Sequence, residues 1–318
     1  MDIVTDLSNC VPPDGGSAVT IGAYDGVHLG HRALLAELAD RARAEGLTTA
    51  VVTFDRHPAA VVRPDSAPRL LCDLDQKLEL LESAGVDCTV VVHFDEERAN
   101  ETAEDFVDTV LVRALGTRLV VVGQDFHFGH GRKGNVALLT EMGRTAGFEV
   151  DGVSLRSDGE GTGPALPISS TRIRTLVADG RVEDAAQLLG RPHQVRGVVA
   201  HGDHRGGPEL GYPTANVAVP AEICLPAAGI YAGFYERPDG SRWSTAISVG
   251  RRPTFYGGGG DLLVEAYLLD FSGDLYGEAA RVSFVSHLRD EVAFDTVDEL
   301  IAQMGRDVAV TRERLAGR

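Results

Sequence analysis

The first half of the chain alternates short Val-rich apolar runs with segments of helical periodicity. Helical patterns span 32–45, 73–85 and 102–116. The apolar runs are SAVTIG at 17–22, TTAVVTF at 48–54, CTVVVHF at 88–94 and RLVVVG at 118–123. Strands that are buried on both faces are continuously apolar, and helices are the usual connection between parallel strands. The alternation therefore predicts a doubly wound α/β domain with a parallel sheet.

The second half of the chain changes to a different pattern. The segment 170–190 predicts two short helices broken at Gly180. Strand-like runs then alternate with turn residues, which is typical of an antiparallel β-barrel, and an amphipathic helix is expected at 296–315. A chain of 318 residues is long enough for two domains. We therefore expect an α/β domain at 1–190 and a barrel domain with a terminal helix at 191–318.

The composition argues against several classes of partner and site. The formal net charge is −17, whereas proteins that bind nucleic acid or anionic membranes need clustered Lys and Arg. The acidic N-terminus has no apolar core, so no signal peptide is expected, and no apolar run approaches the roughly 18 residues that cross a bilayer. The four cysteines have no paired spacing, which indicates free thiols in a cytoplasmic protein, neither disulfides nor a zinc site. Weak self-association as a homo-oligomer is left open.

One turn between a predicted strand and a predicted helix concentrates unusual residues. GAYDGVHLGHRALL at 22–35 carries His28 and His31 on either side of Gly30. If the helix starts near Val27, the two imidazoles share one face of its first turn. Free N–H groups and the helix dipole make such a turn an anion site, and both histidines can donate hydrogen bonds to phosphate oxygens. The alternative is a pair of surface histidines, and the spacing is not that of a zinc protease.

The same stretch resembles the HxGH signature of the nucleotidyltransferase superfamily. In its extended form, GAYDGVHLGH is similar to the N-terminal module of bacterial bifunctional riboflavin kinase/FAD synthetases. Further motifs of that family follow in order: VTFDRHP at 52–58, GQDFHFG at 123–129, ISSTRIR at 168–174, LGYPTAN at 210–216 and VEAYLLDF at 264–271. The resemblance implies a Rossmann-like nucleotidyltransferase domain followed by a riboflavin kinase barrel.

The resemblance also implies two successive reactions. The C-terminal module is expected to phosphorylate riboflavin with ATP to give FMN, and the N-terminal module to adenylylate FMN with ATP to give FAD and pyrophosphate. The expected partners are riboflavin, FMN and ATP, with Mg²⁺ accompanying the nucleotide. Two alternatives stay open: only one module is active, or the chain binds flavin without catalysis.

Individual residues receive roles from the same resemblance. His28 and His31 are the expected catalytic pair for adenylyl transfer. The expected ATP contacts there are Gly22, Asp25, Gly30, Asp125, Ser170, Thr171 and Arg174, and the expected flavin contacts are Phe54, His57, Phe126, Phe128 and Arg289. The serine and threonine could instead only cap a helix, and each phenylalanine could instead pack in a core. Pro167 stands where many relatives carry an arginine, which leaves the site one cation short unless Arg172 supplies it.

The expected kinase site combines a Gly-rich turn with a lone acid. GDHRGGPELGYPTAN contains no Walker A sequence, yet its backbone can cradle phosphates. The resemblance assigns Gly202, Gly211 and Thr214 to ATP, and Thr214 and Asn216 to Mg²⁺, which takes oxygen ligands. It makes Glu265, alone among apolar residues of a predicted strand, the general base that accepts the proton of the ribityl 5′-hydroxyl. The alternative places this glutamate on the outward face of an edge strand.

Overall fold

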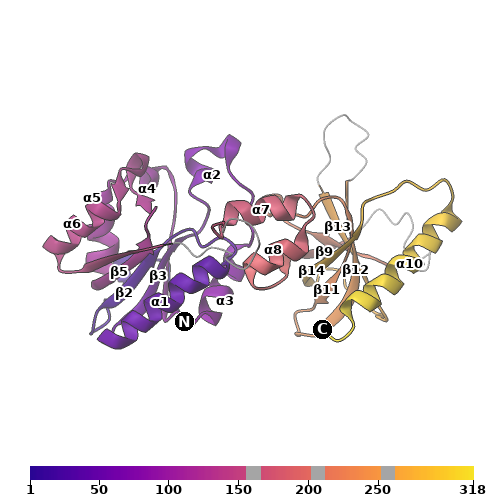
Figure 1. The fold of residues 1–318 in the computed structure, drawn as a ribbon, viewed down its shortest axis with the longest axis horizontal. Helices are drawn as coiled ribbons and strands as arrows, with labels where there is room; N and C mark the ends of the chain where they lie inside the picture. Colours follow the sequence, from indigo (N-terminus) through magenta and orange to yellow (C-terminus); the bar gives the residue numbers. More distant parts are fainter. Residues whose placement is uncertain (155–165, 202–211, 252–261) are drawn as a thin grey trace. The chain divides into compact units, whose positions relative to one another are not determined.

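A computed structural model of the chain describes residues 1–154, 166–201, 212–251 and 262–318. The expected phosphate-loop residues Gly202 and Gly211 lie outside the described residues. The chain divides into two compact units, drawn in Figure 1. The first unit comprises Met1–Pro68 and Leu74–Ser169, and the second comprises Arg69–Asp73 and Ser170–Arg318.

The first unit is built on a six-stranded parallel sheet with the strand order β1-β4-β3-β2-β5-β8. The strands are β1 (Asp2–Val4), β2 (Ser17–Ile21), β3 (Thr48–Phe54), β4 (Cys88–Val92), β5 (Thr117–Gly123) and β8 (Glu149–Val153). Every residue of β2 is buried, as expected for a sheet that is covered on both faces. From β2, strands β3 and β4 extend to one side and β5 and β8 to the other, so the topological switch point lies between β2 and β5. Ligands of open α/β sheets bind at the carboxyl ends of the strands at such a point.

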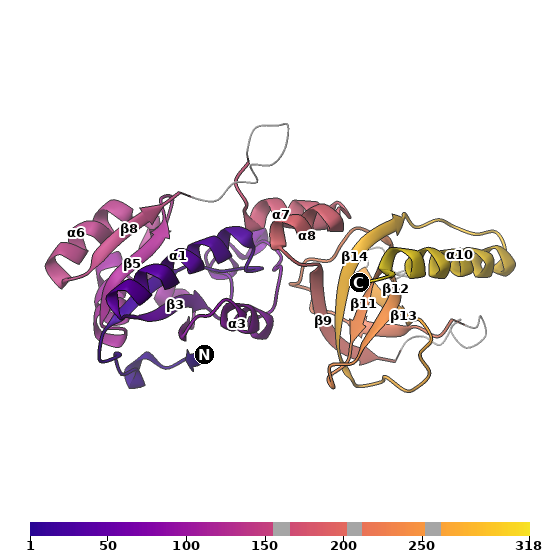
Figure 2. The same ribbon diagram turned by 60° about the horizontal axis from the view of Figure 1, so that its bottom comes forward.

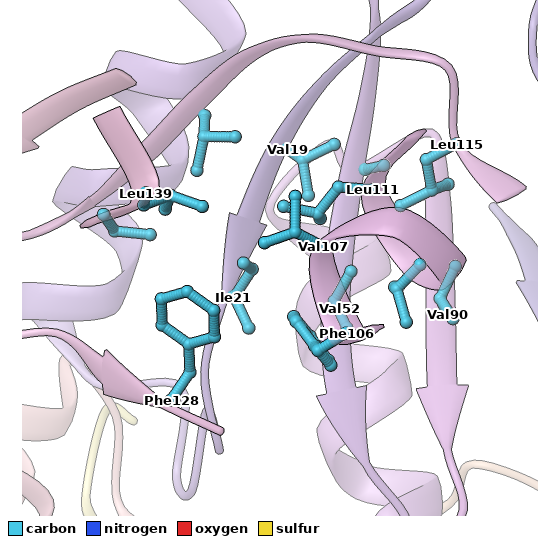
Figure 3. Close-up of a cluster of buried hydrophobic side chains, with 14 of the residues drawn as sticks. Val19, Ile21, Val52, Val90, Phe106, Val107, Leu111, Leu115, Phe128 and Leu139 are labelled. Carbon is cyan, nitrogen blue, oxygen red and sulfur yellow. The ribbon is translucent and has the colours of Figure 1, made fainter. Parts of the chain in front are cut away.

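Helices cover both faces of this sheet. The helical segments of the first unit include α1 (Leu29–Glu45), α2 (Ala59–Val62), α3 (Leu74–Ser83), α4 (Glu96–Asn100), α5 (Ala103–Phe106), the π-helical segment η3 (Val107–Ala114) and α6 (Val136–Ala146). One face packs against α1 and α3, and the other against α5, η3 and α6 (Figure 1). Figure 3 shows the second of these cores, in which Phe106 and Leu111 form one cluster with Ile21 and Val52 of the sheet.

The second unit is built on a closed barrel of six antiparallel strands (Figure 2). The strands, in chain order, are β9 (His193–Ala200), β10 (Ala215–Ala218), β11 (Gly229–Glu236), β12 (Arg242–Arg251), β13 (Leu262–Leu268) and β14 (Ala279–Arg289). Pairing of β9 with β10 closes the circle. Side chains alternate between the interior and the outer face, and Tyr231, Tyr235, Val264 and Ala266 are among those in the interior.

In the described part of the second unit, three helices accompany the barrel. α10 (Val297–Leu315) lies along the outside of the barrel, where Leu315 packs with Ala232 and Phe234. α7 (Ser170–Ala178) and α8 (Val182–Leu189) are separated at Gly180, as predicted. The carboxylate of Glu183 in α8 accepts hydrogen bonds from Ser286 Oγ at 2.7 Å and from the N–H of His287 at 3.0 Å, which fixes α8 to β14. Both α7 and α8 thus pack with the barrel, whereas the expected domain 1–190 includes them.

The architecture confirms the predicted parallel sheet, the predicted barrel and the predicted terminal helix. Strands β1 and β8 and helix α6 were not predicted. β1 is a three-residue edge strand, and β8 is a partly exposed edge strand that contains Gly152, so neither carries a Val-rich signal. The four cysteines are free, with Cys72 and Cys224 buried and the other two partly buried. Among the described residues, none of the helices combines the length and the apolar character that a membrane-spanning helix needs.

Candidate active sites

The turn from β2 to α1 has a strained backbone. Tyr24 and Val27 have positive φ angles of 48° and 36°, and Gly26 between them has a φ of 79°. A left-handed conformation is rare for a β-branched residue, and it persists only where the surrounding structure enforces it. Val27 is fully buried, and the buried hydroxyl of Tyr24 lies 2.8 Å from Thr20 Oγ1. Packing therefore holds this turn in a strained left-handed conformation, and strained backbone of this type is often found at functional sites.

His28 is the N-cap of α1, and its ring stacks on that of His31. Nδ1 of His28 accepts a hydrogen bond of 3.2 Å from the backbone N–H of His31, which leaves Nε2 to carry the ring proton. The two ring centroids are 3.6 Å apart and the planes are inclined by 14°. The expected start of the helix near Val27 was wrong by two residues, because α1 begins at Leu29. The two imidazoles nevertheless lie side by side.

Position 30 requires a glycine, because the ring of His28 and the backbone carbonyl of Ile168 lie close to its Cα. A Cβ atom at this position would lie 3.1 Å from both Cε1 and Nδ1 of His28 and 3.3 Å from the carbonyl oxygen of Ile168. Ile168 is buried and opens the ISSTRIR segment, so this segment begins beside the histidine turn within the first unit. Only glycine fits between the two histidines without displacing one of these groups.

The environment of His31 favours the neutral imidazole. Burial lowers the pKa of His31 well below its usual value, and the neighbouring His28 and the ammonium of Lys77 lower this pKa further. A neutral ring keeps one N–H that can donate to an anionic ligand. The turn can therefore offer hydrogen-bond donors to phosphate oxygens without a resident positive charge on His31.

Sequence reasoning missed Lys77, which is buried in α3 directly under this turn. Its Nζ donates to the carbonyl of Phe54 at 2.7 Å, to Thr53 Oγ1 at 3.2 Å and to the carbonyl of Ala23 at 3.3 Å. Fully buried lysines are rare in proteins. A signal was present in the sequence, because position 77 falls on the apolar face that Leu74 and Leu81 define.

The loop after β3 lies at the same edge of the sheet as the histidine turn, because β3 pairs with β2 in parallel register. Phe54 ends β3 and packs edge-on against Phe94, with 5.2 Å between ring centroids. His57 Nδ1 accepts a hydrogen bond of 3.1 Å from the N–H of Ala59. Two of the expected flavin contacts thus lie next to the histidine turn, Phe54 at the end of β3 and His57 in the loop that follows.

The loop after β5 lies on the other side of the switch point. Asp125 is exposed, and Phe126 is half-buried and stacks on Phe128, with ring centroids 5.4 Å apart. Phe128 is buried in the core beside Phe106, as Figure 3 shows. The core-packing alternative therefore describes the environment of Phe128, whereas Asp125 and part of Phe126 are open to a ligand.

Gly22 and Asp25 lie in the turn after β2, where Asp25 is buried, whereas Ser170, Thr171 and Arg174 belong to the second unit. α7 begins at Ser170, so Ser170 and Thr171 lie in its first turn and Arg174 lies one turn further on. Thr171 is exposed, and the other two are half-buried. The first turn of a helix has free backbone N–H groups, so this segment also provides donors for an anion.

On the barrel, Asn216 and Glu265 lie directly opposite each other on the adjacent strands β10 and β13. Ser248 of β12 is opposite Glu265 on its other side. Val264 and Ala266 point into the barrel core, so Glu265, Asn216 and Ser248 share the outer face, where all three are half-buried. The alternative for Glu265 was correct about the outward face and wrong about an edge strand, because the barrel is closed.

Thr214 extends this group of polar residues. It stands one residue before β10, and it is half-buried like Asn216, whereas Ala215 between them is buried. The alternation continues the outer face of the strand back to Thr214. A hydroxyl, a carboxamide and a nearby carboxylate are oxygen donors of the kind that Mg²⁺ takes.

Arg289, an expected flavin contact, is engaged with α10. Its Nε donates to Asp307 Oδ1 at 2.9 Å and its Nη2 donates to Oδ2 at 2.7 Å, while Nη1 donates to the carbonyl of Asp290 at 2.9 Å. Gln303 Nε2 also donates to Asp307 at 2.8 Å. These bonds fasten β14 to α10, and the expected flavin contact of Arg289 stays a prediction.

Comparisons with known proteins agree with the two halves of this description. Residues 11–172 match the model of the FAD synthetase family, and residues 189–315 match the model of the riboflavin kinase family. The chain is 38% identical over 305 residues to the bifunctional riboflavin kinase/FMN adenylyltransferase of Escherichia coli (strain K12), which covers 95% of this chain and 93% of the relative. The chain belongs to the bifunctional riboflavin kinase/FMN adenylyltransferase family. The enzyme of the same description from Pseudomonas fluorescens is 36% identical over 313 residues, covering 98% of this chain and 97% of the relative.

A solved structure has the same fold along the whole chain. A crystal structure described as a macrolide-efflux protein from Streptococcus pneumoniae matches with a TM-score of 0.85 and 32% identity, covering 98% of each chain. The family membership confirms the expected pair of activities. The enzyme uses ATP to convert riboflavin to FMN in its riboflavin kinase part and FMN to FAD in its FAD synthetase part.

Proposed function

We propose that the His28–His31 turn is the centre of adenylyl transfer. A phosphate oxygen of FMN attacks the α-phosphorus of ATP, the bond to the β-phosphate breaks, and pyrophosphate leaves. The imidazole N–H groups and the first turn of α1 donate to the phosphate oxygens as negative charge redistributes, so neither histidine forms a covalent bond. The observation that carries this proposal is the pair of stacked imidazoles, 3.6 Å apart, at the carboxyl end of β2.

The other ligand contacts of this reaction are proposed from the family's motifs, and those in the first unit follow the strands on either side of the switch point. Gly22 and Gly30 allow close approach to the backbone, and Asp25 and Asp125 are assigned to ATP together with Ser170, Thr171 and Arg174. Phe54, His57 and Phe126 are assigned to the flavin. Phe128 is not assigned to the flavin, because its ring is buried in the core beside Phe106.

We propose that the kinase reaction takes place on the outer face of the barrel at Glu265. The ribityl 5′-hydroxyl of riboflavin attacks the γ-phosphorus of ATP, its proton passes to the carboxylate of Glu265, and ADP leaves. A carboxylate is a weak base toward an alcohol, so it mainly orients the hydroxyl and accepts the proton late. The direct cross-strand pairing of Glu265 with Asn216 is the observation that carries this assignment.

Thr214 and Asn216 are the residues that we assign to Mg²⁺. Both are half-buried, both supply neutral oxygen atoms, and Glu265 lies opposite Asn216, so the donor set suits a hard cation that retains waters and substrate phosphates in its shell. The ion would neutralise charge on the transferring phosphates of ATP. We also propose a cytoplasmic location, which is supported by the four free cysteines.

Two single variants test the assignment of residues to reactions. His28→Ala is expected to lower the rate of FAD formation from FMN by about 100-fold or more, the usual effect of losing one preorganised donor, and to spare FMN formation from riboflavin. Glu265→Gln is expected to lower FMN formation and to spare FAD formation from added FMN. If either variant lost both activities while its unfolding curve stayed unchanged, the two-site assignment would be wrong.

A further inference from the structure

Lys77 is exceptional in both the sequence and the structure. The chain has 30 basic residues, of which only Lys77 and Lys133 are lysines, and Lys133 is exposed. Lys77 is only 8% exposed. Nearly every other cationic residue of the chain is an arginine, but the one beneath the histidine turn is a lysine.

The contacts of Lys77 explain why a single ammonium suits this position. Three oxygen atoms lie within 3.3 Å of Nζ: the carbonyls of Ala23 and Phe54 and the hydroxyl of Thr53. The Thr53 hydroxyl also donates to the Ala23 carbonyl at 3.3 Å, so ammonium, hydroxyl and carbonyl form a closed network. An ammonium places three donors around one point, whereas the donors of a guanidinium spread over a planar fork.

The network joins the carboxyl ends of two strands at the site. Ala23 follows β2 and directly precedes Tyr24, the first residue of the strained turn, and Phe54 is the last residue of β3. The ladder between β2 and β3 ends at Ile21 and Val52, so it holds neither of these two carbonyls. The lysine thus fixes the point from which the chain enters the left-handed segment that leads to His28.

We propose that Lys77 is a positioning residue of adenylyl transfer, which fixes the carbonyls of Ala23 and Phe54 and so holds the turn that presents His28 and His31. The inference rests on the proposed assignment of the histidines to this reaction. The ammonium of Lys77 also adds a fixed positive charge beneath a site for phosphates. This charge is among the causes that keep the pKa of His31 low.

The test uses Lys77→Met in the full-length enzyme, because methionine keeps the length of the side chain and removes the ammonium. The kcat of FAD formation is expected to fall about 100-fold, the scale of a misplaced catalytic group, with KM values for ATP and FMN close to those of the unaltered enzyme. FMN formation by the same preparation should be unchanged, because its proposed residues lie in the other unit. An unchanged kcat for FAD formation, or a rise in KM alone, would overturn the proposal.

Two further variants test the positioning role of Lys77. Lys77→Arg restores the charge without the three convergent bonds, so it should remain defective, and full recovery of kcat would contradict a positioning role. If Lys77→Met does not fold, Thr53→Val decides, since it removes both bonds that the Thr53 hydroxyl makes in the network, to Lys77 and to the Ala23 carbonyl, at nearly constant volume. It should lower kcat several-fold without raising KM, and an unchanged kcat would overturn the proposal.

His28→Ala separates this inference from the proposal on which it rests. Loss of FAD formation in His28→Ala together with full activity in Lys77→Met would reject only the role of Lys77. Retained FAD formation in His28→Ala would reject the assignment of the turn itself.

Discussion

The backbone N–H of His31 donates to the ring of His28, and the two rings stack with 3.6 Å between their centroids, so the pair is held as one unit at the start of α1. Nδ1 of His28 accepts the N-cap bond, so Nε2 carries the ring proton. This N–H can donate a hydrogen bond to a phosphate oxygen. The local structure and the proposed chemistry therefore depend on the same hydrogen bond.

Gly30→Ala should damage adenylyl transfer through His28. The added Cβ would lie 3.1 Å from two ring atoms of His28 and 3.3 Å from the Ile168 carbonyl, so the ring must move by a few tenths of an ångström or more. We expect the kcat of FAD formation to fall by about tenfold to 100-fold, because small misplacements of catalytic groups are costly. Steady-state kinetics with FMN and ATP measure this effect. FMN formation by the same enzyme is the internal control, and FAD formation at the unaltered rate would show that His28 has room to adjust.

The buried pair of Tyr24 and Thr20 should show strong coupling in stability. Their hydroxyls are 2.8 Å apart, so Tyr24→Phe and Thr20→Val each leave one buried hydroxyl without this partner. Each single change should lower the free energy of unfolding by about 1–3 kcal/mol, whereas the double variant should cost clearly less than the sum. Urea unfolding of the four proteins, followed by circular dichroism, measures the cycle. Simple additivity would mean that the two hydroxyls do not depend on each other.

Arg289→Met should destabilise the second unit, because it leaves the Asp307 carboxylate, only 7% exposed, without its bidentate partner. Gln303 still donates to that carboxylate, so we expect a loss of about 2–3 kcal/mol, below the range for a fully buried pair. The single tryptophan, Trp243 in β12, reports unfolding of this unit by fluorescence.

The matched control for Arg289 is Arg312→Met. Arg312 and Asp270 also form two hydrogen bonds of 2.6 Å between helix and barrel, but both side chains are exposed. Exposed ion pairs contribute little to stability, so the urea midpoint should hardly move. Equal losses in the two variants would show that burial of Asp307 is not what makes its ion pair important.

His193 should make the second unit sensitive to acid. Its ring is buried in β9, Nε2 lies 2.8 Å from the carbonyl of Cys224, and burial lowers the pKa of His193 from 6.5 to about 4. Between these two values the unfolded chain binds a proton that the folded protein does not bind. The free energy of unfolding should therefore be intact above about pH 6.5 and fall as the pH drops toward 4, by at most about 3 kcal/mol from this group.

His193→Gln isolates this contribution, because an amide N–H can still donate to the Cys224 carbonyl. The difference in unfolding free energy between the variant and the unaltered enzyme should change with pH across this window. His127→Gln, at an exposed position, is the control and should leave the pH dependence as it was. Parallel curves for His193→Gln and the unaltered enzyme would mean that His193 is protonated equally in both states.

The fold was largely readable from the sequence because its signals are local. Val-rich runs identified β2 to β5, and turn residues between short apolar runs identified the barrel strands. The edge strands β1 and β8 escaped prediction, because an edge strand is short or partly exposed and its pairing is decided by the neighbouring strand. The pairing of residues 69–73 with the second unit, through bonds of Leu70 to Glu222 and Cys224, is equally invisible to local patterns.

Candidate site residues could be predicted where they belong to a sequence motif. They could not be predicted where only the tertiary structure brings them to the site. The His28–His31 spacing suggested a shared face, but the stacking and the N-cap bond required the coordinates. Lys77 was missed because a lysine within a helix is usually solvated, and only the meeting of β2, β3 and α3 shows what it binds. Arg289 was predicted only as a flavin contact, and its bonds to Asp307 in α10 could not be seen in the sequence.

Chromatographic analysis of the products from riboflavin, ATP and Mg²⁺ tests most directly whether the two reactions belong to separate sites. His28→Ala should accumulate FMN without FAD, and Glu265→Gln should form neither product from riboflavin while still converting added FMN to FAD. A mixture of the two variants should restore FAD formation from riboflavin, because each supplies the step that the other lacks. Failure of the mixture to form FAD, with both variants folded, would contradict the assignment of the two steps to His28 and Glu265.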